Sequence, residues 1–205
     1  MSLTMLDWRR RITAAYADVR ASRGVDDEGA WHRWRAARDD LFARHPDTPI
    51  DEPSGFRGLH YAAYDESLRF EAPVTDAEPL ALEVQTSDGV VPLRRIGTAQ
   101  LPMGSLDVWW IATYGGGVFV PFADASNGHT TYGGGRYLID TIKGADLGSG
   151  QASLWLDFNY AYHPSCFYSA RWSCPLAQPG NRLATEINAG ELAQPVSATP
   201  APTTA

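Results

Sequence analysis

The spacing of the apolar residues changes once along the chain, near Leu68, and this change limits the possible folds. Before it, apolar residues recur every three or four positions, which is the period of an amphipathic helix. After it, apolar and polar residues alternate, which is typical of strands with one buried face. One hydrophobic core can serve a chain of 205 residues. We therefore expect a single body of strands that carries a helical part at its N-terminal end.

Two helices are predicted in the first 45 residues. The apolar residues that share one face of the first helix are Met5, Trp8, Ile12, Ala15, Tyr16 and Val19. Gly24 is expected to end this helix, and Asp26 or Asp27 to cap the next. The second apolar face, which stops before His45-Pro46, consists of Ala30, Trp31, Trp34, Ala37, Leu41 and Phe42. This pattern predicts a helical hairpin.

The rest of the chain contains seven candidate strands. They are Leu68–Val74, Leu80–Thr86, Val90–Gly97, Leu106–Thr113, Gly117–Phe122, Arg136–Ile142 and Ala152–Phe158. Ser87-Asp88-Gly89 is typical of a tight hairpin turn, and Gly115-Gly116-Gly117 is expected to form another. No helical crossover lies between the strands, so we expect a mainly β (α+β) fold, an antiparallel β-barrel or roll with an N-terminal helical hairpin.

The organisation that follows has four parts. Residues 1–45 form the helical hairpin, and residues 46–67, rich in proline and glycine, form a linker that wraps the body. Residues 68–192 form the antiparallel β-body with the expected site. Residues 193–205 have nothing to bury and are expected to be disordered.

Composition and charge limit the classes of partner that we expect. A net charge of -7 argues against nucleic acid and anionic membranes, which attract basic surfaces. No segment has the length and apolarity of a membrane span or a signal peptide, so we expect a cytoplasmic protein. The two cysteines, Cys166 and Cys174, are then expected to be thiols. The tryptophan-rich helix faces exceed what a two-helix appendage can bury by itself, which predicts a homodimer.

Strand alternation points to a site. Along Leu154–Asn159, alternation sends Trp155, Asp157 and Asn159 to one face, and Arg136 begins another strand. The loop between Asp124 and Gly135 returns the chain to that start. We therefore expect one concavity at an end of the β-body, lined by Asp124, Tyr132, Arg136, Asp157, Asn159 and His163. The alternative is that Arg136, Asp124 and Asp157 form a structural network that ties loops together.

Several ordered motifs carry a family resemblance. They are Phe119-Val120-Pro121-Phe122-x-Asp124, Thr131-Tyr132-Gly133 with Gly135-Arg136-Tyr137-Leu138, Leu156-Asp157-Phe158-Asn159-x-Ala161-Tyr162-x-Pro164-x-Cys166, Cys174-Pro175-Leu176, and Asn181-Arg182-Leu183 through Ala189-Gly190-Glu191. Over most of its length the chain resembles DUF1684, a bacterial family of unknown function, and the resemblance implies no established activity. The family usually has Asn-Pro where this chain has His163-Pro164, so a titratable ring replaces an amide.

Three kinds of chemistry were compared at these residues. A metal site would gather some of His129, Asp157, His163, Cys166, Cys174 and Glu191, but none of them has zinc-type paired spacing, and no metal ligand is assigned. Cys166 is a possible nucleophile three residues after His163. The glycine-rich loop 128–135 lacks the sequence of a phosphate-binding loop and is interpreted as a tight turn.

The sequence leaves the reaction open. We expect an enzyme that acts on a small polar or anionic metabolite by acid/base chemistry in a pocket at the mouth of the barrel, with Asp157 and His163 as the catalytic residues. Its ligand would be held by Asp124, Thr131, Tyr132, Arg136, Asn159 and Tyr162. The alternatives are a binding module without turnover and a metal-dependent enzyme that uses His163 with nearby Asp or Cys. No cofactor is identified, and whether the protein is an enzyme stays uncertain.

Overall fold

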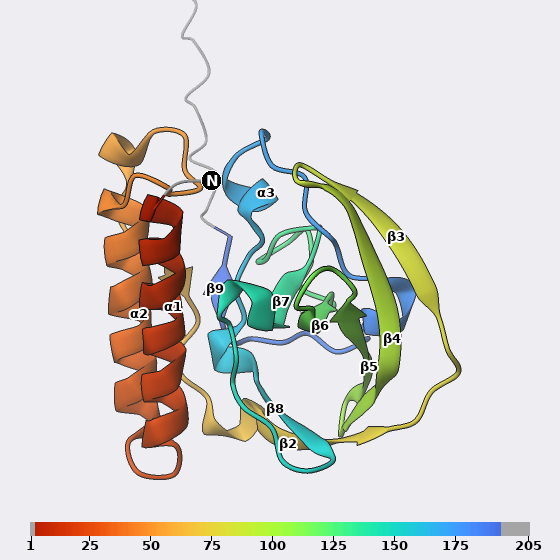
Figure 1. Cartoon of the computed structure of the whole chain (residues 1–205). Helices are drawn as coiled ribbons and strands as arrows, with labels where there is room; N and C mark the ends of the chain where they lie inside the picture. Colours follow the sequence, from red (N-terminus) through yellow and green to blue (C-terminus); the bar gives the residue numbers. More distant parts are fainter. Residues whose placement is uncertain (1–2, 194–205) are drawn as a thin grey trace, which may run out of the picture.

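The computed structural model describes residues 3–193 and shows a helical hairpin packed beside a curled sheet (Figure 1). Helix α1 spans Leu3–Ser22 and helix α2 spans Asp27–Arg44, as the apolar spacing predicted. The chain reverses at Gly24, whose φ of 72° favours glycine. Asp26 occupies the N-cap position of α2 without a side-chain capping bond. The Asp27 carboxylate instead accepts a hydrogen bond from the Gly24 N–H at 2.9 Å.

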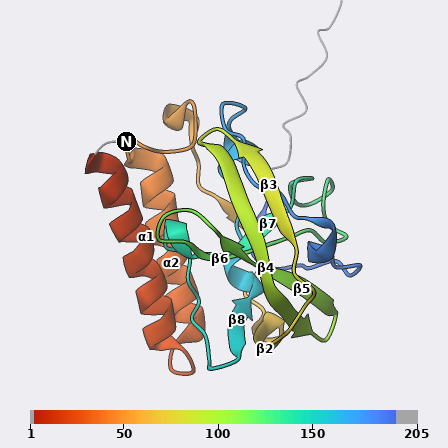
Figure 2. The ribbon, with the colours of Figure 1, turned by 45° about the vertical axis from the view of Figure 1, so that its right-hand side comes forward.

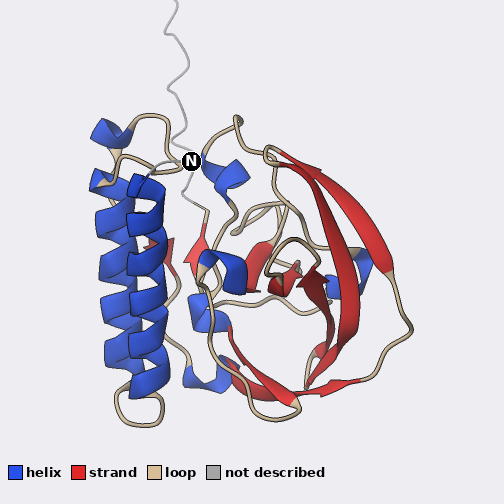
Figure 3. Ribbon diagram, in the orientation of Figure 1, coloured by secondary structure: helices blue, strands red, loops and turns tan. Residues whose placement is uncertain are grey.

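Within residues 3–193, seven strands form one curled antiparallel sheet, a half-barrel (Figure 3). They are β2 (Arg69–Thr75), β3 (Ala81–Thr86), β4 (Gly89–Leu101), β5 (Gly104–Ile111), β6 (Gly117–Phe122), β7 (Arg136–Asp140) and β8 (Ser153–Asp157). Their order is β7-β6-β5-β4-β2-β8, and β3 pairs with β4. The predicted mainly β fold with a helical hairpin is confirmed.

The sheet curls about the long strand β4, which is seen along its length in the turned view (Figure 2). The first half of β4 pairs with β3, and the second half pairs with β2. Between these halves a bulge at Arg95 to Gly97 shifts the register with β5. A Cβ atom at Gly97 would lie 2.8 Å from the Thr75 carbonyl oxygen, so glycine is needed where β2 crosses β4.

Three strands end earlier than the sequence predicted, and at β7 and β8 a carboxylate explains the end. Asp157 accepts a hydrogen bond from the Asn159 N–H at 3.0 Å, which starts a short 3-10 turn at Phe158–Tyr160. Asp140 likewise accepts from the Lys143 N–H at 3.2 Å. Aspartate side chains compete with strand hydrogen bonds in this way. Asn159 therefore lies in a turn, and the strand predicted through Ile142 stops at Asp140.

Shorter elements complete the described chain. Strand β1 (His60–Tyr61) pairs with β9 (Glu191–Leu192) apart from the large sheet, and helix α3 spans Ser165–Tyr168. The remaining 3-10 turns are Pro53–Gly55, Glu66–Leu68, Thr141–Lys143 and Pro179–Asn181. The linker runs along α2, where the Leu59 N–H donates to Asp39 at 2.8 Å. The β1–β9 pair was not predicted, because its partners lie far apart in the chain.

The helix tryptophans are covered by the chain's own sheet side. Trp31 and Trp34 pack with Tyr160, Ala145 and Leu147 between the hairpin and the β-body, and each is at most 3% exposed. A second cluster, which includes Leu106, Phe122 and Phe158, fills the half-barrel. The apolar excess that suggested a homodimer is thus buried within one chain, and the homodimer stays an untested prediction.

Two further expectations concern the whole chain. Among the described helices, none combines the length and apolarity that crossing a membrane requires. The tail predicted to be disordered lies almost wholly outside residues 3–193. Its first residue, Ala193, is described and donates a backbone hydrogen bond to Thr130 at 2.9 Å.

Candidate functional site

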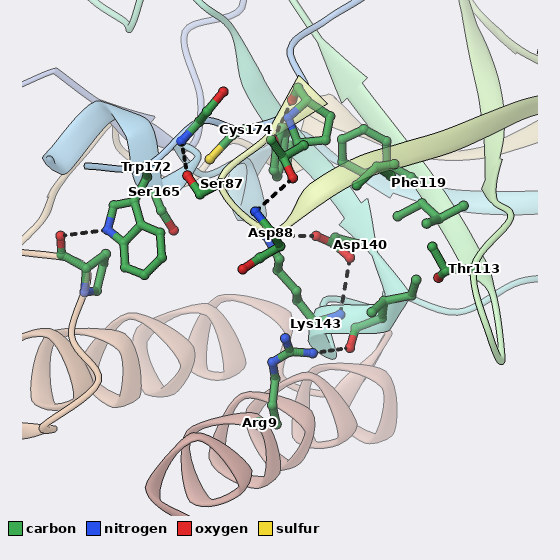
Figure 4. Close-up of a pocket in the computed structure, with 18 of the residues that line it drawn as sticks. Arg9, Ser87, Asp88, Thr113, Phe119, Asp140, Lys143, Ser165, Trp172 and Cys174 are labelled. Atoms are coloured by element: carbon green, nitrogen blue, oxygen red, sulfur yellow. Dashed lines mark hydrogen bonds and ion pairs between the residues drawn. The ribbon is translucent and has the colours of Figure 1, made fainter. Parts of the chain in front are cut away.

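A cavity of about 280 Å³ opens between the helical hairpin and the half-barrel. Side chains from α1, from the turn between β3 and β4, from β7 and from the segment after α3 line it (Figure 4). A second hollow of about 90 Å³ continues from it towards the interior, and both are bounded by Trp8, Pro49, Tyr137, Lys143 and Ser165. We call the first hollow the outer cavity and the second the inner cavity.

A buried ion pair lies at the inner cavity. Arg38 of α2 is 4% exposed and contacts Glu191 of β9, 1% exposed, at 3.0 Å. The Arg38 guanidinium also donates to the Tyr61 hydroxyl at 2.8 Å and lies 5.1 Å from the Tyr162 ring centre. Burial raises the pKa of Glu191, but the attraction of Arg38, with His163 and Tyr168, outweighs it and brings the pKa to about 2. Glu191 is therefore ionised at neutral pH.

His163 lies beside this pair, and only one of its two ring nitrogens has a hydrogen-bond partner. Nε2 accepts a hydrogen bond from the Tyr132 N–H at 3.2 Å, so the proton of the neutral ring is on Nδ1. Nδ1 lies 3.6 Å from Glu191 Oε1, which is too long for a good hydrogen bond. His163 lines the inner cavity and is 2% exposed. It is therefore a buried residue of the cavity wall.

Tyr16 brings a second unpaired group to the same hollow. It lines the inner cavity and is 1% exposed, and within residues 3–193 its hydroxyl donates to no acceptor. Burial raises the pKa of Tyr16, so its hydroxyl keeps its proton. The Trp34 indole N–H acts as a hydrogen-bond donor towards the Tyr16 hydroxyl oxygen and lowers its pKa, so it is the hydroxyl proton of Tyr16 that lacks an acceptor. Two residues that line the inner cavity, Tyr16 and His163, thus each carry a buried donor, Oη–H and Nδ1–H, that lacks a well-placed acceptor.

The outer cavity has aromatic walls and a charged rim. Its walls include Trp8, Phe119, Tyr137 and Trp172. Arg9 of α1 and Lys143 lie near each other at the rim, where Arg9 donates to the Ile142 carbonyl at 2.6 Å and Lys143 lies 3.8 Å from Asp140 (Figure 4). Asp88 and Cys174 also line this cavity. An apolar body with polar ends would match these surroundings.

Arg136 and Asp124, predicted to bind ligand, form a sealed structural pair. Arg136 is 1% exposed and donates to Asp124 at 2.7 Å. It also donates to the carbonyl oxygens of Ile187, Ala189 and Glu191. Neither residue lines the outer or the inner cavity. The guanidinium holds the C-terminal segment against the Asp124 loop, as the structural alternative expected for these two residues, whereas Asp157 is not part of this network.

Asp157 and Asn159 contact each other as predicted but lie elsewhere. The Asn159 amide donates to Asp157 at 2.8 Å, and Asp157 pairs with Arg69 at 3.1 Å. Asp157 lines a separate hollow of about 10 Å³ with Arg23, Asp27 and Arg69. Burial raises the pKa of Asp157 to about 6 against the hydrogen bonds from Asn159 and the charge of Arg69. The six residues therefore do not line one concavity, because the 3-10 turn at Phe158–Tyr160 turns Asp157 and Asn159 towards the loop between α1 and α2.

Of the other predicted residues, some line the inner cavity and some pack behind the residues that line it. Tyr162 lines the inner cavity, and its backbone pairs with Tyr137. Thr131 is buried, with its hydroxyl 2.7 Å from that of Ser126. The Tyr132 hydroxyl lies 3.8 Å from the Cys166 sulfur. Of the predicted set, His163 and Tyr162 reach the cavity, and Thr131, Tyr132 and Cys166 lie behind its wall.

The sequence reasoning missed Arg38, Tyr16 and Tyr168. Arg38 follows Trp34 by four residues and precedes Phe42 by four, so a charged residue falls in the middle of an apolar helix face. That pattern was the available signal, since a buried charge needs a partner. Tyr168 donates a hydrogen bond to Glu191. From the sequence, Glu191 was expected only as the end of a family motif and as one of several candidate metal ligands.

A metal centre gains no support from the described side chains. Within residues 3–193, no group of three or more His, Cys, Asp or Glu residues is placed to hold a metal ion. Cys166 and Cys174 are both free thiols.

Comparison with known proteins agrees with the motifs. A family model described as "Protein of unknown function (DUF1684)" matches residues 54–192. The chain belongs to the DUF1684 family. The matched range includes the whole β-body and ends at β9, so Glu191 lies inside the DUF1684 region, whereas Arg38 and Tyr16 lie before it. The Arg38–Glu191 pair, like the two donor residues Tyr16 and His163, therefore combines one residue of the DUF1684 region with one residue of the preceding hairpin.

A solved structure is similar over most of the chain. The solution structure of the uncharacterized protein from gene locus rrnAC0354 of Haloarcula marismortui is 36% identical, with a TM-score of 0.57, and the match covers 82% of this chain and 95% of that one. The comparison with curated proteins found no match. These comparisons support the family and the fold, and they name no activity.

Proposed function

We propose that the protein binds a small molecule in the joined outer and inner cavities, with a hydrogen-bond acceptor of the ligand at the inner end. The observation that carries this proposal is the pair of buried donors, Tyr16 Oη–H and His163 Nδ1–H, on one hollow. Leaving a buried donor unsatisfied costs about 1–3 kcal/mol. A ligand carbonyl, carboxylate or similar oxygen would satisfy both donors, and this gain would contribute to affinity.

The dimensions favour a small ligand. The outer cavity of about 280 Å³ lies near the lower end of the range for small-molecule sites, roughly 300–1,000 Å³. Its aromatic walls suit an apolar body. Arg9 and Lys143 at the rim suit a second acceptor group, neutral or anionic. The ligand class proposed is therefore a small amphipathic molecule with an oxygen acceptor at its buried end.

Binding without turnover is favoured over acid/base catalysis. His163 Nε2 already accepts a hydrogen bond from the Tyr132 N–H, and in that tautomer Nδ1 carries the ring proton, so neither nitrogen is free to accept a proton from a ligand. Asp157, the other expected catalytic residue, lies on a different hollow. A general base must reach the proton that it removes. Catalysis by Asp157 and His163 stays an untested prediction.

A thermal-shift screen against a metabolite library tests the proposal, because any ligand that binds the folded state raises its stability. A matched pair of variants locates the binding. Ser165→Trp places a large ring where the outer and inner cavities meet, whereas Ser105→Trp places the same ring on the exposed side of β5. Compounds that stabilise the wild type and Ser105→Trp should fail with Ser165→Trp. Equal stabilisation of both variants would contradict the proposed location.

A further inference from the structure

One carboxylate oxygen in the outer cavity lacks a hydrogen-bond donor. Asp140 ends β7 and lines this cavity, and its side chain is 4% exposed. Its Oδ1 accepts the Lys143 N–H at 3.2 Å, which starts the 3-10 turn after β7 (Figure 4). Its Oδ2 lies 3.8 Å from Lys143 Nζ, which is too long for a hydrogen bond, and within residues 3–193 no other group donates to it. Oδ2 is therefore an unpaired acceptor on the cavity wall.

The backbone holds this carboxylate in place. The Asp140 N–H donates to the Ala145 carbonyl at 2.9 Å, and the Ala145 N–H donates back to the Asp140 carbonyl at 3.0 Å. Asp140 also pairs with Phe119 of β6 in the sheet. The Lys143 side chain is 45% exposed, so its ammonium group can bond water instead of Oδ2. Asp140 thus keeps its place at the wall, and Oδ2 stays open to a ligand.

A second acceptor on the same cavity is also unpaired. Asp47 lines the outer cavity, and its buried Oδ2 accepts no hydrogen bond from the described residues. The nearby His45 Nδ1, 4.0 Å away, accepts the Asp47 N–H at 3.1 Å and so has no proton to donate. The outer cavity therefore has unpaired acceptors, whereas the inner cavity has unpaired donors. A ligand that fits both hollows must donate in the outer one and accept in the inner one.

The charges around Asp140 favour a neutral donor over an ammonium group. Burial raises the pKa of Asp140, while the charge and the N–H of Lys143 and the charge of Arg9 lower it and so favour the ionised carboxylate. An ionised carboxylate only accepts hydrogen bonds. An ammonium group of a ligand at Oδ2 would be repelled by Lys143 and Arg9. A hydroxyl or an amide N–H meets no such repulsion.

We propose that the outer cavity selects molecules with a neutral hydroxyl or amide N–H that donates to Asp140 Oδ2. This inference rests on the proposed binding function and names its ligand class. The ligand is a small, largely apolar molecule that carries an alcohol, phenol or amide donor in addition to the oxygen acceptor for Tyr16 and His163. Asp140 then determines specificity, because a buried acceptor that is left unpaired disfavours any ligand that cannot donate to it.

The test takes each alcohol, phenol or amide that stabilises the wild type in the thermal-shift screen and compares it with its O- or N-methylated form by titration calorimetry. Methylation removes the donor. In Asp140→Asn the amide oxygen stays with the Lys143 N–H, so the amide NH2 group replaces Oδ2 and no longer accepts. Methylation should therefore weaken binding to the wild type about ten-fold more than binding to Asp140→Asn. This difference separates the hydrogen bond from the bulk of the added methyl group.

Asp88→Asn is the matched control, because Asp88 lines the same cavity but is exposed, so this variant removes a negative charge without changing Oδ2. It should show the wild-type effect of methylation. The wild-type comparison needs no variant, and equal binding of the parent and methylated compounds would by itself contradict the inference.

The outcomes distinguish this inference from the binding proposal. Equal effects of methylation in the wild type and Asp140→Asn, or stabilising compounds that all lack a donor, would overturn selection by Asp140 and leave the binding proposal standing. A screen in which no compound stabilises the protein would overturn the binding proposal, and this inference with it.

Discussion

Arg38 in the middle of α2 and Glu191 in β9 form an ion pair of 3.0 Å although neither side chain is more than 5% exposed. The pair joins the helical hairpin to the last strand of the β-body beside the inner cavity, which Arg38 lines. The Arg38 guanidinium also donates a hydrogen bond to the Tyr61 hydroxyl. The Tyr168 hydroxyl donates one to Glu191. Because both partners are withdrawn from water, each depends on the other for its charge to be tolerated.

Arg38→Met should therefore destabilise the protein by about 3–5 kcal/mol, because Glu191 is left buried and unpaired. Urea denaturation measures the change. Arg33→Met is the matched control on the same helix, since its ion pairs with Asp18 and Asp26 are about half exposed and screened by water, so its loss should change stability little. Similar losses in the two variants would show that the Arg38–Glu191 pair does not join the two parts.

Arg136→Met should cost a similar amount, about 3–5 kcal/mol, through the loss of its pair with Asp124. The structural role of Arg136 also predicts what stays unchanged. Ligands found in the screen should stabilise the folded variant by the same amount as the wild type, because Arg136 lines neither cavity. If the folded Arg136→Met variant bound none of these ligands, Arg136 would be part of the binding site.

Asp157 should make stability fall as pH rises through the acid range. Its pKa in the folded protein is about 6, above the ordinary value of about 3.9 for an unfolded chain, so the folded state binds more protons between these values. The stabilising effect of protonation is complete below about pH 4 and is lost by about pH 6, a difference of about 2–3 kcal/mol. Asp157→Asn should flatten this part of the pH profile.

Glu83→Gln is the matched control for the loss of one carboxylate, because Glu83 is exposed on β3. It should leave the slope between these pH values unchanged. Chemical denaturation at a series of pH values gives both profiles. An Asp157→Asn profile with the wild-type slope would show that another group carries the proton.

Tyr16→Phe should separate stability from binding. Removing a buried hydroxyl that donates to no acceptor should leave the free protein unchanged or stabilise it by up to about 1 kcal/mol, while the affinity for the ligand falls. Tyr137→Phe is the control, because its hydroxyl donates to Pro175 and its loss should destabilise the protein by about 1 kcal/mol. A clear loss of stability in Tyr16→Phe would mean that its hydroxyl is already satisfied.

The sequence predicted the framework well because local signals determine it. The apolar helix face around Trp31 and Trp34 and the alternation from Leu68 onwards can each be recognised within a few residues. Asp88-Gly89 by itself indicates a hairpin turn. Strand ends were less accurate at Asp140 and Asp157, where a side chain accepts a backbone N–H and starts a turn. That choice between strand and turn depends on neighbours that alternation does not reveal.

The site was predicted only in part because it is built across the fold. Alternation brought Asp157 beside Asn159 and the loop brought Asp124 beside Arg136, and both contacts exist. Nothing local could show that these pairs lie at separate places. The cavity instead depends on α1 and α2 meeting the residues around His163, a contact between segments more than 100 residues apart in the chain.

The most direct test of the binding proposal is a structure of the protein with the compound that stabilises it most in the screen. The account predicts the compound in the joined cavities, with an oxygen acceptor within hydrogen-bond distance of Tyr16 Oη and His163 Nδ1 and its apolar part between Trp8 and Trp172. A compound bound at another place, or in the cavities with no acceptor facing these two donors, would contradict it.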